Sequence, residues 1–406
     1  MNFTKPKKVV GLDIGSHSVK AVQVSRSGGE LVVDDVGYAL IDRGELNSDP
    51  IMAHANAVRE AMDHLAVKQS MVVGALPGQT VVIRYPRLRN VSPTELGQAV
   101  QTEAAHNIPY DLSEVLLDWT LLEEEQDGDN NQLKVLMVAA KHEVIDSRVQ
   151  YAQAADIEYG CLSVDSLALA DAAEKCHYLS GEESTALINI GASSVSIHFL
   201  NKGVSNFIRD INWGTKELVQ SISKFRHVDF DTAEHLLIQA INENTGESEE
   251  VPAEASAATE APAESVDNAS LLEPLSDELE TPQIDSSLGF EEGGSSGSGP
   301  AETPISEIIS TPISRFVTEV RRSFDYYEHQ LYEHPVERVI LSGGIAPLNQ
   351  IHTALSNDLG VNEVVVADPT NGAIKFGRKA DMTKFGQHPS QYMVAVGLAA
   401  RGISEL

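Results

Sequence analysis

Residues 9–25 constrain the fold of this chain more than any other stretch. An apolar run ends at Asp13, a short Gly/Ser turn follows, and a second apolar run leaves through Lys20. This pattern predicts two antiparallel strands joined by a tight turn. Gly15 allows the backbone of the turn to adopt a positive φ or to approach a ligand closely. The turn can therefore present its backbone N–H groups to a phosphate.

The side chains of this turn favour a nucleotide phosphate as the ligand. Lys20 offers a positive charge, and Ser16, His17 and Ser18 add backbone N–H groups and hydroxyls. A carboxylate beside a phosphate is unfavourable unless a cation lies between them, so Asp13 predicts a bound Mg²⁺. An ordinary hairpin that binds no phosphate could have the same Ser/Gly turn, because short glycine motifs are weak signals on their own.

Two later segments carry related patterns and decide between these alternatives. Residues 186–197 repeat the order of apolar strand, polar residue, isoleucine, glycine and small turn around Asn189 and Gly191. A third glycine element, Gly343 and Gly344, follows another apolar strand. Together the three elements resemble the signature of the actin-like ATPase superfamily. The resemblance implies an α/β actin-like ATPase fold, with two related lobes around a nucleotide cleft.

The resemblance also implies ATP and Mg²⁺ as cofactors, with Asp13 as the metal ligand. Asp165 opens a predicted helix, where it either caps the N-terminus, as Asp often does, or faces the cleft. A polar residue at this place helps to orient the attacking water in the superfamily, so Asp165 is the candidate catalytic residue. The expected cofactor-binding residues are Asp13, Gly15, Ser16, His17, Ser18, Lys20, Asn189, Gly191, Ala192, Ser193, Ser194, Gly214, Gly343 and Gly344.

Composition narrows the class of protein. The length of 406 residues is enough for two or more domains. The net charge of −31 argues against nucleic-acid binding and against electrostatic attachment to anionic lipid. The two cysteines are too few for a disulfide framework. Neither a signal peptide nor an apolar run of about 18 residues is present, so we expect a cytoplasmic protein that does not insert into the membrane.

Residues 86–157 are predicted to form a small inserted subdomain. Ser92-Pro93-Thr94-Glu95 predicts a helix start with a capping box, and the helix runs to about residue 105. Strands are expected at 114–122 and 133–140 around a polar turn at 124–131, followed by a helix at 142–155. His106 and His142 lack partners at metal-ligand spacing, so we expect no metal site there.

Periodicity predicts the other elements. The expected strands are 31–40, 71–75, 80–84, 203–210, 338–342 and, as the last strand, 363–367. The expected helices are 50–67, a helix opened by Asp165, 213–225, 231–240, 305–332, 348–359 and 391–401.

Residues 244–303 differ in kind from the rest. They are rich in Ala, Glu, Ser and Pro, and no Lys or Arg occurs between His227 and Ser314. Such a segment cannot bury enough apolar surface to order itself, so we expect a disordered acidic insertion. Apolar islands at 271–275 and 284–290 are either partner-binding motifs or parts of a plain linker, and the linker is favoured.

In this order, the elements resemble one branch of the superfamily, the PilM family of type IV pilus assembly proteins. The resemblance covers nearly the whole chain except residues 244–303. It rests on residues 11–16 with 20–22, and on residues 103–104 with Ile108-Pro109-Tyr110-Asp111. It also rests on Val164-Asp165 and on residues 189–192, 341–344 and 394–399. In this branch the inserted subdomain is of the type called 1C.

The resemblance implies a function and partners. Members of this family are ATP-binding cytoplasmic scaffolds that hold the N-terminal cytoplasmic peptide of a PilN-like inner-membrane protein in a groove beside the 1C subdomain. They link this membrane protein to the pilus motor ATPases. We therefore expect a protein that is peripheral to the inner membrane through its partner, with self-association as a further possibility.

The resemblance also divides the chain. Lobe I is expected at 1–85 (the first part of subdomain 1A) and 158–190, the 1C-like subdomain at 86–157, and lobe II (2A and 2B) at 191–243 and 304–385. The acidic insertion lies at 244–303, and 386–406 form a C-terminal helix that returns to lobe I.

One departure from the family bears on catalysis. The second hairpin usually carries Asp where this chain has Asn189. An amide can bond to a metal-bound water but brings no charge, so we expect weak ATPase activity or none. Two alternatives remain at this stage. An FtsA-like cell-division protein would need a C-terminal membrane-targeting helix, and a sugar kinase would need a catalytic Asp and a substrate domain.

Overall fold

The computed structural model describes residues 6–27, 30–89, 91–92, 94–127, 130–244, 303–372, 374–377, 380, 385–386 and 388–405. The predicted disordered insertion at 244–303 therefore lies outside the described residues, apart from its two end residues. Within the described ranges, no helix is long and apolar enough to cross a membrane.

Two sheets with the same order of pairing form the two lobes. In each sheet a hairpin carries a third antiparallel strand on one side and two parallel strands on the other. This repeat is the pattern expected of two related halves. The lobe I sheet has the order β15-β3-β2-β1-β4-β9: Ile374–Phe376, Glu30–Leu40, Ser18–Ser27, Lys8–Ile14, Met71–Leu76 and Tyr159–Val164. The lobe II sheet has the order β12-β11-β10-β13-β14: Val204–Ile211, Val195–Asn201, Ser184–Ile190, Arg338–Gly343 and Glu363–Val366.

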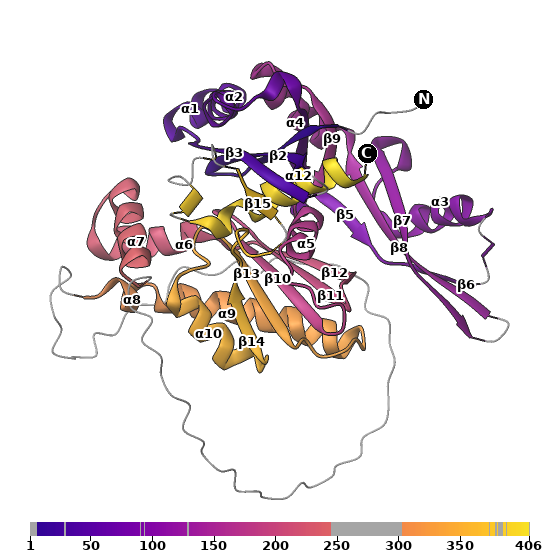
Figure 1. Cartoon of the computed structure of the whole chain (residues 1–406). Coiled ribbons are helices and arrows are strands. Elements are labelled where there is room, and N and C mark those ends of the chain that lie inside the picture. Colours follow the sequence, from indigo (N-terminus) through magenta and orange to yellow (C-terminus); the bar gives the residue numbers. More distant parts are fainter. Residues whose placement is uncertain are drawn as a thin grey trace, which may run out of the picture.

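Two helices, α5 (Asp165–Lys175) and α12 (Met393–Glu405), lie between the sheets (Figure 1). Their small residues form one buried core with apolar side chains from both sheets. The helices approach each other closely at Gly397, where a Cβ atom would lie 1.7 Å from the carbonyl oxygen of Ala168. This core joins the lobes behind the space where their hairpins meet.

The other helices cover the outer faces of the sheets. On lobe I these are α1 (Arg43–Ser48), α2 (Pro50–Met62) and α4 (His142–Ala154), which bury the apolar face of β1 and β2. On lobe II the covering helices are α6 (Thr215–Arg226), α7 (Phe230–Asn244), α8 (Ile305–Ile308), α9 (Ser310–Asp325) with a π-helical turn, and α10 (Asn349–Leu359).

A third, small sheet projects from one side of the molecule (Figure 1). It contains β5 (Val81–Arg84), β6 (Arg87–Arg89), β7 (Val115–Asp127) and β8 (Asn130–Lys141), and α3 (Leu96–Asn107) packs on it with a core of its own. Although it is inserted in lobe I, this unit also contacts lobe II, because the Tyr85 hydroxyl lies 2.7 Å from the Ser205 hydroxyl. The buried Lys134 ammonium likewise donates to Asn206.

The structure corrects several predicted boundaries. Strand β5 pairs with β8 of the small sheet, and α4 packs on lobe I, so the small unit spans 81–141 rather than 86–157. Strand β10 pairs with β11 and β13, so lobe II begins before 191. Strand β15 pairs with β3, so the strand at 363–367 is not the last one and the chain returns to lobe I before 386. These boundaries depend on strand pairing and helix packing that the local pattern does not specify.

Two local predictions in the small unit are also wrong. Ser92 does not cap α3, because its hydroxyl donates to Glu95 Oε2 (2.6 Å) within a turn that precedes the helix at Leu96. The polar turn expected at 124–131 is mostly paired strand, since β7 and β8 continue to Asp127 and Asn130.

Candidate functional site

A cleft of about 820 Å³ lies between the lobes, and both hairpin turns open into it. The two turns have the same backbone closure: the Gly15 N–H donates to the Ser18 carbonyl (3.1 Å), and the Gly191 N–H donates to the Ser194 carbonyl (3.0 Å). The sequence repeat is therefore a repeat of geometry. Two tight turns of this kind, one from each lobe, suit an elongated anion such as a polyphosphate.

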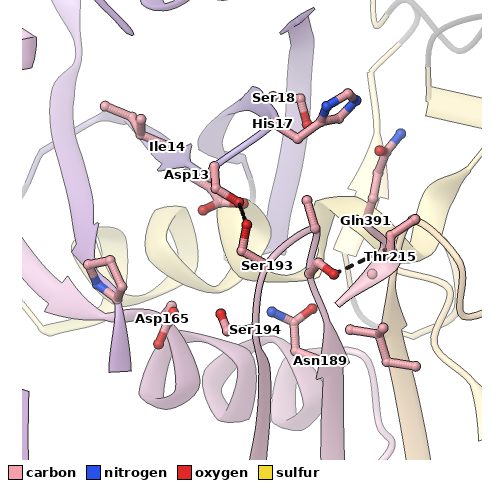
Figure 2. Close-up of a pocket in the computed structure, with 18 of the residues that line it drawn as sticks. Asp13, Ile14, His17, Ser18, Asp165, Asn189, Ser193, Ser194, Thr215 and Gln391 are labelled. Atoms are coloured by element: carbon pink, nitrogen blue, oxygen red, sulfur yellow. Dashed lines mark hydrogen bonds between the residues drawn. The ribbon is translucent and has the colours of Figure 1, made fainter. Parts of the chain in front are cut away.

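The turns touch across the cleft. The Ser16 and Ser193 hydroxyl oxygens lie 2.9 Å apart, and Figure 2 shows Asp13, Asp165, Asn189, Ser193 and Ser194 around one space. The predicted residues that line the cleft are Asp13, Gly15, Ser16, His17, Ser18, Lys20, Asp165, Asn189, Gly191, Ala192, Ser193, Ser194, Gly343 and Gly344.

Three of the predicted residues have roles that the sequence did not specify. Gly214 does not line the cleft but supports the second turn, because a Cβ atom there would lie 2.4 Å from the Ala192 carbonyl oxygen. The His17 ring points to α7, with Nε2 3.4 Å from Glu234 Oε1, and its burial lowers its pKa. Gly343 has φ +105°, a conformation that favours glycine.

The two hairpin strands place one polar residue each at the cleft. Asp13 lies opposite Lys20 in the ladder of β1 and β2, with Nζ 3.8 Å from the carboxylate. The Asn189 amide oxygen accepts a hydrogen bond from the Ser342 hydroxyl at 3.1 Å, which fixes the orientation of the amide. Asp13 thus carries the negative charge at this level of the cleft, and Asn189 contributes none.

Asp165 faces the cleft and does not cap its helix. The cap position of α5 is Val164, which makes no side-chain cap bond, so the capping alternative is wrong. The Asp165 carboxylate instead accepts hydrogen bonds from the Gly78 N–H (3.0 Å) and the Ser166 N–H (2.6 Å). Burial raises the pKa of Asp165 to about 7, and the negative charge of Asp210 acts in the same direction.

Asp210, at the end of β12, is a cleft residue that sequence reasoning missed. A Cβ atom on Gly78 would lie 2.9 Å from Asp210 Oδ2 and 3.3 Å from Asp165 Oδ1, so the two carboxyl groups flank this glycine from opposite lobes. Burial raises the pKa of Asp210 to about 6. No local pattern marks Asp210, because its approach to Asp165 depends on how the lobes pack.

The mouth of the cleft is bridged by a second contact between the lobes that the sequence did not reveal. Arg43, at the start of α1, lies 2.7 Å from Glu234 on α7 and also bonds to Asp231. Its guanidinium lies over the Phe230 ring, 4.1 Å from the centroid. These contacts hold α7 against lobe I beside His17.

Arg148 on α4 is a further cleft residue that the sequence did not reveal, and it lies in the predicted inserted subdomain. Its Nη1 atom donates to the Ile14 carbonyl oxygen at 3.0 Å, directly beside the first turn. Arg148 also lines the cleft and adds positive charge to it.

Comparison with known proteins places the chain in a family. Residues 11–249 and 300–403 match the family described as type IV pilus assembly protein PilM. The chain belongs to the PilM family. This match favours the pilus-assembly prediction over the cell-division and sugar-kinase alternatives.

The chain is also similar to several solved structures. The "PilM-PilN type IV pilus biogenesis complex" matches with a TM-score of 0.70 and 21% identity over 98% of each chain. EutJ from Carboxydothermus hydrogenoformans matches with a TM-score of 0.49 and 12% identity over 98% of this chain and 91% of its own. MreB 5 of Spiroplasma citri, bound to AMPPNP, matches with a TM-score of 0.44 and 12% identity over 97% of this chain and 95% of its own. The strand order and the likeness to the PilM–PilN structure show the expected actin-like ATPase fold.

The residues of this PilM-family cleft fit a hydrated Mg²⁺ better than a metal bound only by protein. Among the described residues, no group of three or more His, Cys, Asp or Glu side chains could hold a metal. Asp13, Asp165 and the Asn189 amide instead offer oxygens around one space, and Mg²⁺ commonly keeps several waters when it binds beside phosphates. The Ser196 hydroxyl, which also lines the cleft, is buried without a hydrogen-bond partner in the described structure.

The carboxyl pair predicts a pH dependence of stability for this PilM-family protein. Asp165 and Asp210 hold their protons more tightly in the folded chain than at the ordinary pKa of 3.8, so unfolding releases protons between about pH 4 and pH 7. The free energy of unfolding contributed by the pair falls as the pH rises through this window. Asp210→Asn removes the Asp210 carboxyl and with it the negative charge beside Asp165. We therefore expect this variant to be more stable than wild type at pH 8.

Thermal melts of the nucleotide-free protein in EDTA at pH 5 and pH 8 check this prediction. The melting temperature of Asp210→Asn should exceed that of wild type at pH 8 by about 3 °C or more, with a smaller difference at pH 5. Asp63→Asn, at an exposed position on lobe I, is the control and should follow wild type. An Asp210→Asn variant that loses stability equally at both pH values would contradict the assigned pKa direction.

Proposed function

We propose that this protein binds Mg-ATP in the cleft and acts as a cytoplasmic scaffold in type IV pilus assembly. The observation that carries the proposal is the meeting of two like turns, one from each lobe, at 2.9 Å between Ser16 and Ser193. The turns and Lys20 would hold the phosphates, and Gly343 and Gly344 would border the nucleotide.

Asp13 and Asp165 would hold the waters of the Mg²⁺ shell, with Asn189 as a neutral third partner. The metal would supply positive charge that offsets the phosphates. Arg148 and Lys20 add fixed positive charge from lobe I. Bound nucleotide would stabilise the closed two-lobe form, because it contacts both turns and binds the folded chain alone.

The proposed partner is the N-terminal cytoplasmic peptide of a PilN-like membrane protein. Two observations support it: the membership in the PilM family and the likeness to the solved PilM–PilN complex. The cleft also extends to the junction between lobe I and the small sheet, where Thr80, Val144 and Ser147 line it. An extended peptide with apolar anchors fits such a junction. The peptide would hold the protein at the inner membrane, and the protein would link it to the pilus motor ATPases.

Lys20→Ala tests the nucleotide site. The variant loses a charge-assisted phosphate contact worth about 1.5–3 kcal/mol, so the Kd for Mg-ATP should rise about tenfold or more. Isothermal titration calorimetry measures both affinities. Lys8→Ala is the matched control, because Lys8 is on β1 of the same hairpin but pairs with Asp34 away from the cleft. Equal affinities of wild type and Lys20→Ala would refute the proposed site.

Val144→Arg tests the partner site in the intact chain. A long charged side chain at the junction should weaken binding of a synthetic peptide with the first residues of the cognate PilN-like protein by about tenfold or more. The control is Gln150→Arg, at an exposed position of the same helix that does not line the cleft. Fluorescence anisotropy gives the peptide affinity, and ATP affinity should stay near wild type in both variants. Unchanged peptide binding by Val144→Arg would move the interface elsewhere.

A further inference from the structure

The outer edge of β7 is open. In the described structure β7 pairs with β8, whereas β5 and β6 lie on the other side of β8. The ladder is regular from Val115 to Leu121, and a register shift between Leu121 and Glu123 ends this flat part. An open edge presents unpaired N–H and C=O groups that can pair with another strand.

This edge carries apolar side chains rather than the charges that usually protect an edge strand. Leu116, Trp119 and Leu121 are 57%, 37% and 41% exposed. Edge strands of monomeric proteins are commonly blunted by lysine, proline or bulges. Along 115–121 the one charge is Asp118, and the bulge begins only after Leu121. The features point to an edge that another strand covers.

The sequence of the β7 edge indicates which strand covers it. The segment Leu116-Leu117-Asp118-Trp119-Thr120-Leu121-Leu122 is nearly a palindrome about Trp119. Two copies of one strand that pair antiparallel about a twofold axis place residues at equal distances from the centre opposite each other. Centred on Trp119, the pairing places Asp118 opposite Thr120 and Leu117 opposite Leu121 within the regular ladder. It also brings Leu116 opposite Leu122, which lies at the register shift.

We propose that two copies of this chain associate through antiparallel pairing of their β7 edges, centred on Trp119. The small sheets of the two copies then form one continuous sheet. The small unit projects from the side of the lobes, so the pairing leaves the nucleotide cleft of each copy open (Figure 1).

The charges and hydrogen bonds favour this register over its neighbours. Centred on Asp118, the pairing would set two like charges opposite each other, which is destabilising. Centred on Thr120, it would set Leu116 opposite Glu124. In the single chain the Trp119 N–H donates to the carboxylate of its neighbour Asp118 at 2.9 Å. In the pair a main-chain bond can replace that contact, and the Asp118 carboxylate can accept from the Thr120 hydroxyl of the other copy.

The interface is short, so the association should be reversible. A strand edge of seven residues buries less than the roughly 1,200 Å² typical of stable complexes. We expect monomer at low micromolar concentration and dimer at about tenfold to a hundredfold higher concentration. Sedimentation velocity of the full chain over this concentration range measures the fraction of dimer.

Leu121→Lys places a charge on the edge and should keep the chain monomeric over the whole range. The matched control is Ile51→Lys, on α2, because Ile51 is 40% exposed and lies far from the small sheet in sequence. This control should dimerise as wild type does. A wild type that is monomeric at every concentration overturns the proposal and leaves the edge to a different protein. A dimer that Leu121→Lys does not weaken also overturns it.

Cysteine cross-linking tests the register. Under mild oxidation, an equal mixture of Asp118→Cys and Thr120→Cys should give a disulfide-linked dimer, and each variant alone should give far less. Mass spectrometry should assign the link to positions 118 and 120 rather than to Cys161 or Cys176. Strong linkage of either variant alone would place the centre on that residue and refute the register centred on Trp119.

Discussion

Gly397→Ala is expected to destabilise the protein severely, although alanine normally favours a helix. In the interior of an exposed helix this change would gain about 1 kcal/mol. Here the new Cβ atom would lie 1.7 Å from the Ala168 carbonyl oxygen and 3.2 Å from the Ala172 nitrogen. Both are backbone atoms of α5, so no side chain can move aside, and α12 must shift away from α5.

The expected loss is about 3 kcal/mol or more, at the upper end of the cost of overpacking a core. Because α5 and α12 belong to the core that joins both sheets, the shift should also open the cleft between the lobes. Thermal or urea denaturation measures the loss, and the yield of soluble protein should fall with it. Gly386→Ala is the control, since no heavy atom lies within 4 Å of its Cβ position. A Gly397→Ala variant as stable as wild type would show that the helices pack less closely.

Local chemistry was enough to predict the parts of the site that lie within single hairpins. Asp13, Gly15 and Lys20 occupy one hairpin, and the ladder alone brings Asp13 and Lys20 face to face. The same holds for the turn at Gly191. The repeat of one pattern in two places also predicted that the lobes are related, which the matching order of strands confirms.

Contacts between distant segments could not be predicted in this way. Strand β15 has only three residues, and it joins β3 because the chain returns from lobe II at that point. Asp210 reaches the cleft through the packing of one lobe on the other, and Arg43 meets Glu234 for the same reason. Periodicity reports which face of an element is buried but not which element covers it.

The Asp165 carboxyl illustrates both what a local sequence pattern predicts and what it misses. Its place at a helix start was correct, and capping was one of the two predicted roles because Asp is common at helix starts. The structure instead gives Asp165 the Gly78 N–H, from the turn that follows β4, as a hydrogen-bond donor. The position of Asp165 in the cleft therefore depends on a contact that no local rule contains.

Asn189→Asp is expected to raise ATP hydrolysis at least about tenfold above a slow wild type. Hydrolysis needs a water in line with the γ-phosphate and positive charge that neutralises the phosphates. Asn189 has its amide oxygen fixed by Ser342 and cannot take a proton from water or add charge to the metal shell. An aspartate can keep the bond from Ser342 with one oxygen and offer the other, as a charge, to the same space as Asp13. Wild-type turnover should lie far below the common enzyme range of about 1–10³ s⁻¹.

Single-turnover hydrolysis with excess protein separates this effect from product release. Asn189→Ala is the matched control: it removes the amide without adding a carboxylate and should be no faster than wild type. The double variant Asn189→Asp with Asp165→Asn should lose most of the gain, because Asp165 lines the same space and is expected to orient the water. Wild-type turnover near 1 s⁻¹, or an Asn189→Asp variant no faster than wild type, would show that the missing carboxylate is not what limits hydrolysis. An increase in both Asn189→Asp and Asn189→Ala would instead show that the fixed amide itself obstructs the water.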